Sequence, residues 1–291
     1  MENKLSGVFV PNITVFNQDG TVNYSNMVKH IQWMENKGVN GFFVLGSYGL
    51  STFLSLDEKI NILKYLRENT SSFYIIQVGD NDIDNAVKLA KVSESLGYTH
   101  ISAVAPNYYT YSKHEVINYY KRISEATGQF VYAYNNPYTT GVDITSEMLE
   151  ELKEVGVAGL KDSTGNVELY LKCKELNLDY ILGTSKNWPL FNLLGAKCMI
   201  AGMCNYAPEV IVNLYQACAF NDIKKIEKYY HSMLNLNISS KGINSTVLSN
   251  MGVNIREIVK SYPKYPFDTF DENSKEYQLF KENILKEVEI N

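Results

Sequence analysis

Short apolar runs alternate with longer amphipathic segments along most of the chain. The runs Val39–Leu45, Phe73–Gly79 and His100–Ala105 contain few polar residues, which is typical of strands buried on both faces. The segments Val22–Lys37 and Asp84–Leu96 carry apolar residues at helical spacing, and each is followed at once by a glycine that suits a helix end. This alternation of strand and helix predicts a parallel sheet covered by helices.

The pattern continues far enough to close a barrel. One strand is predicted before these units at Gly7–Phe16, and further strands at Phe130–Tyr134, Val157–Leu160, Tyr180–Leu182 and Cys198–Cys204. Counting gives about eight strand–helix units, the number that closes a (β/α)8 TIM barrel. An open doubly wound sheet is the alternative, but no Gly-x-Gly-x-x-Gly follows the first strand.

The last part of the chain has a different character. After about Phe220 the helical spacing continues, and further helices are predicted around Thr246–Val259 and Asn273–Val288 without a convincing strand. We therefore predict a barrel over residues 1–220 and a helical C-terminal extension, residues 221–291, packed on the barrel.

Composition and net charge limit which kinds of molecule the protein is expected to bind. The 291 residues are 45% hydrophobic and carry a net charge of −5, which argues against nucleic acid or an anionic membrane as a partner. No stretch approaches the roughly 18 apolar residues of a membrane span, and the N-terminus lacks the apolar core of a signal peptide. We therefore expect a cytoplasmic protein that acts on a small molecule.

Neither a metal nor a cofactor is expected. The four histidines show no ligand spacing, and the four cysteines show no Cys-x-x-Cys pair. In a reducing compartment these cysteines are expected to be free thiols that pack as small hydrophobic residues.

Two reactive side chains stand at the carboxyl ends of consecutive strands, where barrel enzymes carry their functional groups. Lys161 directly follows Val157–Leu160, and Tyr134 ends the preceding strand, so their backbones should be neighbours about 5 Å apart. Low dielectric lowers the pKa of such a lysine, and its neutral amine can form a Schiff base with a ketone. A lysine that merely extends its ammonium into water is the alternative, but a neighbouring phenol is a suitable proton shuttle.

Other strand ends supply candidates for substrate binding. The glycine-rich turn Gly46–Gly49 carries hydroxyls at Ser47 and Tyr48, and its backbone N–H groups can bind a carboxylate. The remaining candidates are four residues at other strand ends: Tyr132, Ser163, Ser185 and Gly202. The hydroxyls among them suit a neutral polyol, because hydroxyl pairs need donors and acceptors but no counter-charge.

Three blocks of the sequence resemble the pyruvate-dependent class I aldolases. Lys161 lies in Gly-Leu-Lys-Asp-Ser-Thr-Gly, Tyr134 lies in Tyr-Asn-Asn-Pro-x-x-x-Gly, and the third block is Gly46-Ser-Tyr-Gly. Their order and spacing agree with this superfamily, which includes dihydrodipicolinate synthase and N-acetylneuraminate lyase, over Val8–Val210. The blocks are collectively specific, although each is weak alone.

The resemblance implies roles for individual residues. Lys161 would form the Schiff base, Tyr134 would act as acid and base, and Ser47 and Tyr48 would bind the substrate carboxylate. It also implies a homotetramer in which Tyr108 lies near a subunit interface and takes part in the proton relay.

Departures from the pattern favour one subfamily. Dihydrodipicolinate synthases carry an arginine where this chain has Thr139, and N-acetylneuraminate lyases place acidic residues where it has Ser185 and Lys186. The glycine-rich turn is followed by Leu50, and in this respect the chain most resembles the archaeal 2-keto-3-deoxygluconate aldolases. In those enzymes the position of Tyr48 is normally threonine.

The resemblance therefore implies an aldehyde-lyase that reversibly cleaves a 2-keto-3-deoxy sugar acid to pyruvate and glyceraldehyde. One alternative is condensation of pyruvate with another aldehyde, as in the dihydrodipicolinate synthases and N-acetylneuraminate lyases. A catalytically silent barrel that binds a ligand is the other.

Overall fold

Eight parallel strands form one closed barrel in the order in which they occur in the chain, as the sequence predicts. The structure is a computed structural model that describes residues 4–267 and 270–290. The strands are β1 (Gly7–Val10), β2 (Gly41–Val44), β3 (Tyr74–Gln77), β4 (His100–Val104), β5 (Phe130–Asn135), β6 (Val157–Asp162), β7 (Asp179–Leu182) and β8 (Cys198–Ile200). Each is buried along nearly its whole length, which explains why the runs are apolar rather than alternating.

Helices follow the strands and continue beyond the last one. They are α1 (Tyr24–Glu35), α2 (Leu56–Asn69), α3 (Ile83–Ser95), α4 (Lys113–Ser124), α5 (Pro137–Thr140), α6 (Ser146–Glu154), α7 (Val167–Glu175), α8 (Trp188–Leu193), α9 (Pro208–Ala219), α10 (Ile223–Ser239), α11 (Ser245–Ile255) and α12 (Lys275–Ile290). Short 3-10 turns stand at η1 (Ser51–Phe53), η2 (Ser185–Asn187) and η3 (Gly202–Asn205). The sequence signals of helix starts hold, since Ser55 with Glu58 forms the expected capping box of α2.

The chain divides into two compact units. The first unit comprises residues 54–200 with residues 4–6, and the second comprises residues 7–53, 201–267 and 270–290. The domain boundary at residue 220 stays a prediction.

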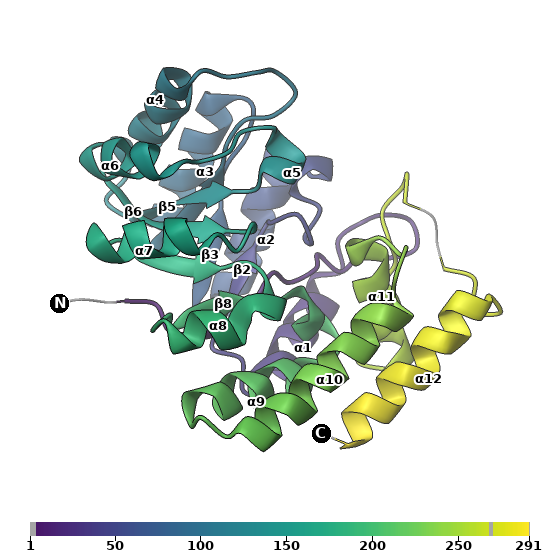
Figure 1. Cartoon of the computed structure of the whole chain (residues 1–291). Coiled ribbons are helices and arrows are strands. Elements are labelled where there is room, and N and C mark those ends of the chain that lie inside the picture. The colour runs from purple at the N-terminus through teal and green to yellow at the C-terminus, as the bar shows by residue number, and fades with distance from the viewer. Residues whose placement is uncertain (1–3, 268–269, 291) are drawn as a thin grey trace. The chain divides into compact units, whose positions relative to one another are not determined.

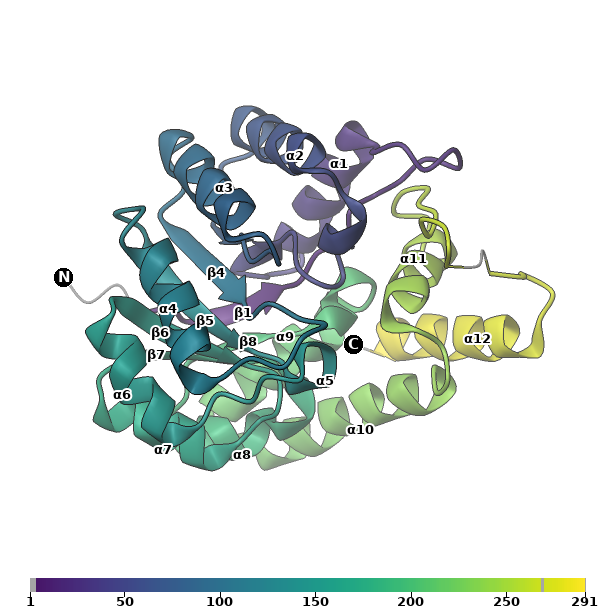
Figure 2. The same cartoon turned by 90° about the horizontal axis from the view of Figure 1, so that it is seen from above.

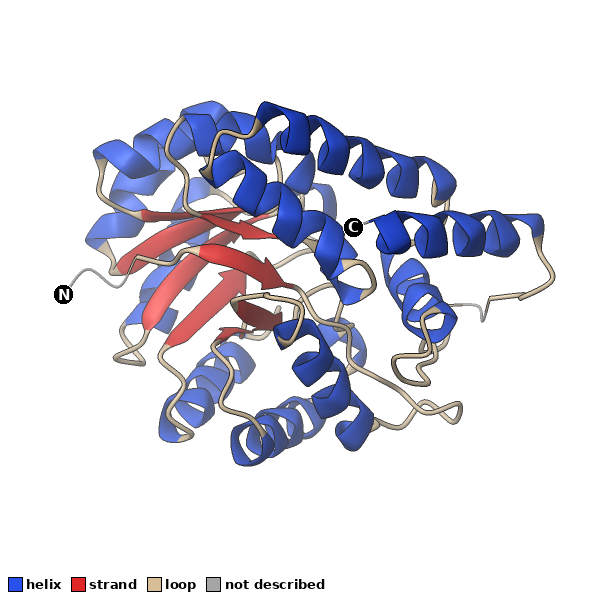
Figure 3. Ribbon diagram, turned by 90° about the horizontal axis from the view of Figure 1, so that it is seen from below, coloured by secondary structure: helices blue, strands red, loops and turns tan. Residues whose placement is uncertain are grey.

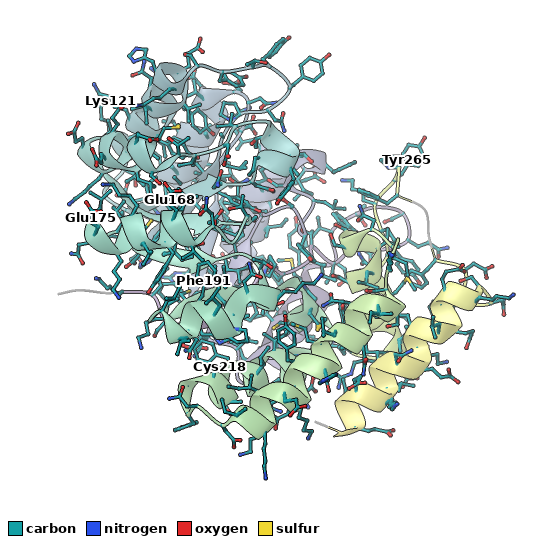
Figure 4. The ribbon with its side chains drawn as sticks, in the orientation of Figure 1. Lys121, Glu168, Glu175, Phe191, Cys218 and Tyr265 are labelled. Atoms are coloured by element: carbon teal, nitrogen blue, oxygen red, sulfur yellow. The ribbon has the colours of Figure 1, made fainter. Side chains whose placement is uncertain are left out.

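In the first unit, β3 to β7 pair with their neighbours, and the β5–β6 ladder has one register shift between Val131 and Tyr132. Figure 1 shows α6 and α7 next to β5 and β6, and Figure 3 shows the strands of the barrel side by side with helices along their outer side. The outer face of α7 carries the exposed Glu168 and Glu175, which Figure 4 labels. Inside this layer of strands there is no room for a side chain at Gly159 of β6. A Cβ atom at Gly159 would come within 2.8 Å of the Tyr132 ring and 2.6 Å of the Asp179 carbonyl oxygen, so this position requires glycine.

In the second unit, helices of the C-terminal region pack together. Figure 2 shows α12 next to both α10 and α11. Arg256, at the end of α11, donates to both Glu209 carboxylate oxygens on α9, each at 3.0 Å, and to the Tyr206 carbonyl at 2.8 Å. This fork fixes α11 to the start of α9.

The predicted and observed strands differ at one or both ends, as three of them illustrate. The first is shorter than predicted, because β1 stops at Val10. The last also stops early, because the chain turns into η3 after Ile200 although Met203 and Cys204 are apolar. By contrast, β6 runs two residues further than predicted and includes both Lys161 and Asp162.

The four cysteines are free and buried, as expected for small hydrophobic residues. Among the residues that the structure describes, no helix combines the length and apolar character needed to span a bilayer.

Two buried histidines are expected to make the protein sensitive to acid. Burial lowers the pKa of His30 and of His100 to about 4 from the ordinary 6.5. The unfolded chain therefore takes up protons first as the pH falls below 6.5, and stability is lost down to about pH 4. Between about pH 7.5 and about pH 5, each histidine should lower the free energy of unfolding by about 2 kcal/mol.

Urea unfolding followed by circular dichroism at the two pH values measures this loss. His100→Gln should reduce it, whereas His114→Gln, on the exposed side of α4, should leave it unchanged. Equal pH dependence in all three proteins would show that His100 is not protonated on unfolding.

Candidate active site

Lys161 and Tyr134 lie opposite each other on adjacent strands. They are register partners in the β5–β6 ladder, as the sequence predicts. The Lys161 Nζ lies 3.1 Å from the centroid of the Tyr134 ring. Both side chains are buried, with 3% and 6% of their surface exposed. The pair is therefore held by two paired strands rather than by a mobile loop.

The surroundings of Lys161 favour the neutral amine. Burial lowers the pKa of the Lys161 ammonium below its ordinary value, while the Tyr134 phenol and then the Asp162 carboxylate oppose this effect. Burial is the largest of these influences, because a charged amine loses its hydration in the strand layer. A lysine with a lowered pKa is a nucleophile toward ketones.

The Tyr134 hydroxyl has polar neighbours. It accepts a hydrogen bond from the Asn136 amide at 3.3 Å, and the Ser163 hydroxyl donates to it at 3.5 Å. The Ser163 backbone N–H in turn donates to the Asn135 carbonyl at 3.0 Å. The phenol thus belongs to a small chain of hydroxyl and amide groups that can move a proton.

The other candidates of the first unit have different surroundings. Tyr132 is fully buried, and its hydroxyl donates to Asp179 at 2.8 Å. Ser185 begins η2 and is half-buried. Tyr108 exposes 89% of its surface, has a left-handed backbone with a φ of 79°, and contacts Tyr109 edge to face. Ser163 is thus the candidate that directly contacts the Tyr134 hydroxyl.

The candidates of the second unit lie in two loops that touch. Ser47 is exposed and Tyr48 half-buried in the loop after β2. The Tyr48 phenol packs against the backbone of Gly202, so closely that a Cβ atom there would overlap the ring. Gly202 therefore holds its position because it has no side chain.

The loop after β2 carries backbone strain that the sequence did not reveal. Leu45 and Leu50 both have left-handed backbones, with φ values of 62° and 53°. Such conformations cost about 1 kcal/mol or more for a residue with a side chain and collect at functional sites. The strain shapes the turn Gly46–Gly49, in which the Thr14 hydroxyl donates to the Gly49 carbonyl at 2.7 Å.

Asp162 is a polar residue of the site to which sequence reasoning gave no role. Its carboxylate is fully buried beside Lys161 and accepts hydrogen bonds from several donors. The only sequence signal was a charged residue directly after the lysine. Among the described residues, no group of three or more His, Cys, Asp or Glu side chains is placed to hold a metal ion.

Comparison with known proteins identifies the family. The sequence pattern of the dihydrodipicolinate synthetase family matches residues 4–287, nearly the whole chain. The chain belongs to this family. The resemblance of the three sequence blocks is thereby confirmed at the level of the family.

Similar proteins with known names include an aldolase, a lyase and a synthase. A 2-dehydro-3-deoxy-phosphogluconate/2-dehydro-3-deoxy-6-phosphogalactonate aldolase of Saccharolobus solfataricus is 31% identical over 215 residues, 72% of this chain and 68% of the relative. An N-acetylneuraminate lyase of Pasteurella multocida is 33% identical over 182 residues, 61% of this chain and 62% of the relative.

A solved structure of the same family extends the similarity over the chain. It is a variant of the Sulfolobus solfataricus 2-keto-3-deoxygluconate aldolase in complex with L-2-keto, 3-deoxy-galactonate. The two chains superimpose with a TM-score of 0.89 at 28% identity, and 98% of each is covered. The family and the barrel fold are therefore established together.

Proposed function

We propose that the protein is a class I aldolase that forms a Schiff base between Lys161 and a 2-keto acid. The observation that carries this proposal is the buried amine of Lys161, 3.1 Å from the ring of Tyr134 on the neighbouring strand. Burial keeps a share of the amine neutral and hence nucleophilic, and the adjacent phenol supplies a proton carrier.

The proposed cleavage runs through an iminium ion. The Lys161 amine attacks the C2 carbonyl of a 2-keto-3-deoxy sugar acid, and loss of water gives the protonated Schiff base. Tyr134 gives its proton to the hydroxide that leaves C2 as water, and the resulting phenolate takes the proton of the C4 hydroxyl. The electrons of the C3–C4 bond move into the iminium, which releases the aldehyde and leaves an enamine, and the regenerated phenol can then supply the proton to C3. Protonation of C3 and addition of water then release pyruvate and restore the amine.

Other predicted residues enter the proposal with narrower roles. Ser163 and Ser185 would hydrogen-bond the polyol part of the substrate, and Tyr132 remains a candidate for the same task. Ser47 and Tyr48 would bind a keto-acid carboxylate, for which the strained glycine-rich loop offers backbone N–H groups. A homotetramer with the exposed Tyr108 near an interface is the proposed assembly.

For the substrate, we propose an unphosphorylated sugar acid of the 2-keto-3-deoxygluconate type. Thr139 stands where dihydrodipicolinate synthases have an arginine, and its hydroxyl donates to the Asn136 carbonyl within α5 at 3.2 Å. This position therefore offers no positive charge to a second carboxylate or a phosphate.

Borohydride trapping followed by an aldehyde panel tests the proposal. Incubation with pyruvate and borohydride should leave a stable adduct on Lys161, located by peptide mass spectrometry. Absence of an adduct, or an adduct on another lysine, would exclude the mechanism. With pyruvate as donor, glyceraldehyde should then give a higher kcat/KM than its 3-phosphate or an N-acetylated or amino aldehyde. A preference for any of those three would assign the chain to another substrate.

A further inference from the structure

The Asp162 carboxylate is the most heavily hydrogen-bonded acidic group beside the lysine. One oxygen accepts from the Asn135 amide at 3.1 Å and from the Thr164 backbone N–H and hydroxyl at 3.0 and 2.7 Å. The other accepts from the Asn166 backbone N–H at 3.0 Å and the Tyr180 hydroxyl at 2.8 Å. A buried carboxylate is tolerated only with such donors, since burial removes its water.

These donors come from every segment that borders the lysine in the first unit. Asn135 ends β5, directly after Tyr134, while Thr164 and Asn166 belong to the loop that carries Ser163. The backbone adds a further link, because the Gly183 N–H donates to the Asp162 carbonyl at 2.7 Å. The ends of β5, β6 and β7 are therefore tied to one residue.

One donor is itself rigidly supported. The ring of Tyr180 stacks on Phe191 of α8, labelled in Figure 4, with centroids 5.7 Å apart and planes 8° from parallel. Burial and the neighbouring Asp162 raise the pKa of Tyr180, so its hydroxyl remains a donor. Helix α8 thereby fixes one side of the carboxylate.

We propose that Asp162 is the positioning residue of the Lys161–Tyr134 pair. It acts by holding the end of β5 and the loop Ser163–Asn166, and its charge supports the ammonium form of Lys161. The expected effect of Asp162 on turnover rests on the proposed aldolase function. Its effect on the Lys161 amine is independent of that function.

The charge of Asp162 shifts the pKa of Lys161 in a definite direction. Tyr134 from β5 and Asp162 from β6 both oppose the lowering of the lysine pKa by burial. Asp162 itself faces Cys173 from α7 and Tyr180 from β7. Burial and the nearby carboxylates raise the pKa of Cys173 to about 12, so this thiol is uncharged and adds no negative charge to that of Asp162. Removing the Asp162 charge should therefore lower the pKa of Lys161 further.

The test compares Asp162→Asn with a matched control, Asp143→Asn. Asp143 also accepts from the Asn135 amide, at 3.3 Å, but is exposed and bonds none of the loop 163–166. Competitive acetylation with acetic anhydride, read by mass spectrometry across a pH series, reports the amine of Lys161 whether or not the protein is an aldolase. Pyruvate trapping and turnover are measured on the same samples.

Asp162→Asn should move the midpoint of Lys161 acetylation to lower pH and reduce turnover at least about tenfold, because small displacements of reacting groups are costly. Asp143→Asn should match the wild type in both. An unchanged midpoint and unchanged turnover in folded Asp162→Asn would overturn the proposal. A shifted midpoint with no pyruvate adduct in the wild type would instead retain Asp162 and reject the aldolase function.

A second variant covers the case in which Asp162→Asn does not fold. Tyr180→Phe keeps the charge and removes one donor, so the loop should loosen. Acetylation of Lys161 should then be faster by about fivefold, the effect of one lost hydrogen bond. Wild-type acetylation in this variant would show that the hydrogen bonds of Asp162 do not position the lysine.

Discussion

Lys161→Arg is expected to lower aldol turnover at least about ten-thousandfold, the scale of loss when a covalent nucleophile is removed. Arginine retains the positive charge and much of the length of the side chain, but its guanidinium stays protonated and cannot attack a carbonyl. Steady-state kinetics with pyruvate and glyceraldehyde measure the loss. The pyruvate adduct should disappear in the same variant.

Lys153→Arg is the matched control, since Lys153 is exposed near the end of α6 and is not part of the site. It should retain both turnover and adduct formation. Turnover within about tenfold of the wild type in Lys161→Arg would mean that the catalytic nucleophile is another group, since removal of a covalent nucleophile costs far more than tenfold.

Tyr134→Phe should reduce turnover by about a hundred- to ten-thousandfold, the usual contribution of a general acid–base group. The ring and its packing over Lys161 remain, and only the hydroxyl that contacts Asn136 and Ser163 is lost. The variant should therefore fold and still form the pyruvate adduct. The measurement pairs kcat with the extent of borohydride trapping.

Tyr138→Phe provides the control from the adjacent helix α5, where the side chain is exposed. It should be indistinguishable from the wild type. If Tyr134→Phe turned over at the wild-type rate, proton transfer would have to run through another group, and Tyr134 would have only a packing role.

Local signals explain which parts of the fold could be predicted. The capping box of α2 depends on residues three positions apart, so Ser55–Glu58 could be read from the sequence; α4 begins with a second box of the same kind, Ser112–Glu115. The neighbouring positions of Tyr134 and Lys161 followed from the order of parallel strands, and the β5–β6 register agrees.

Long-range contacts explain what sequence reasoning missed. The strand β6 was predicted to end at Leu160 because a lysine and an aspartate usually mark a loop. The Asp162 carboxylate is instead satisfied by Asn135 and Tyr180, which are 27 residues before it and 18 residues after it. No pattern in the neighbouring sequence predicts hydrogen-bond partners at such distances along the chain. The Tyr132 hydroxyl likewise has a partner 47 residues away, Asp179.

The packing of Tyr48 on Gly202 has a consequence for how this protein can diverge. A larger residue at position 202 collides with the phenol, so either the half-buried Tyr48 ring turns away or position 48 carries a smaller side chain. A small side chain at 48 leaves an open space above the glycine that either water or a bulkier ligand can occupy. Replacing Tyr48 by a smaller residue therefore widens the range of side chains that position 202 can accept.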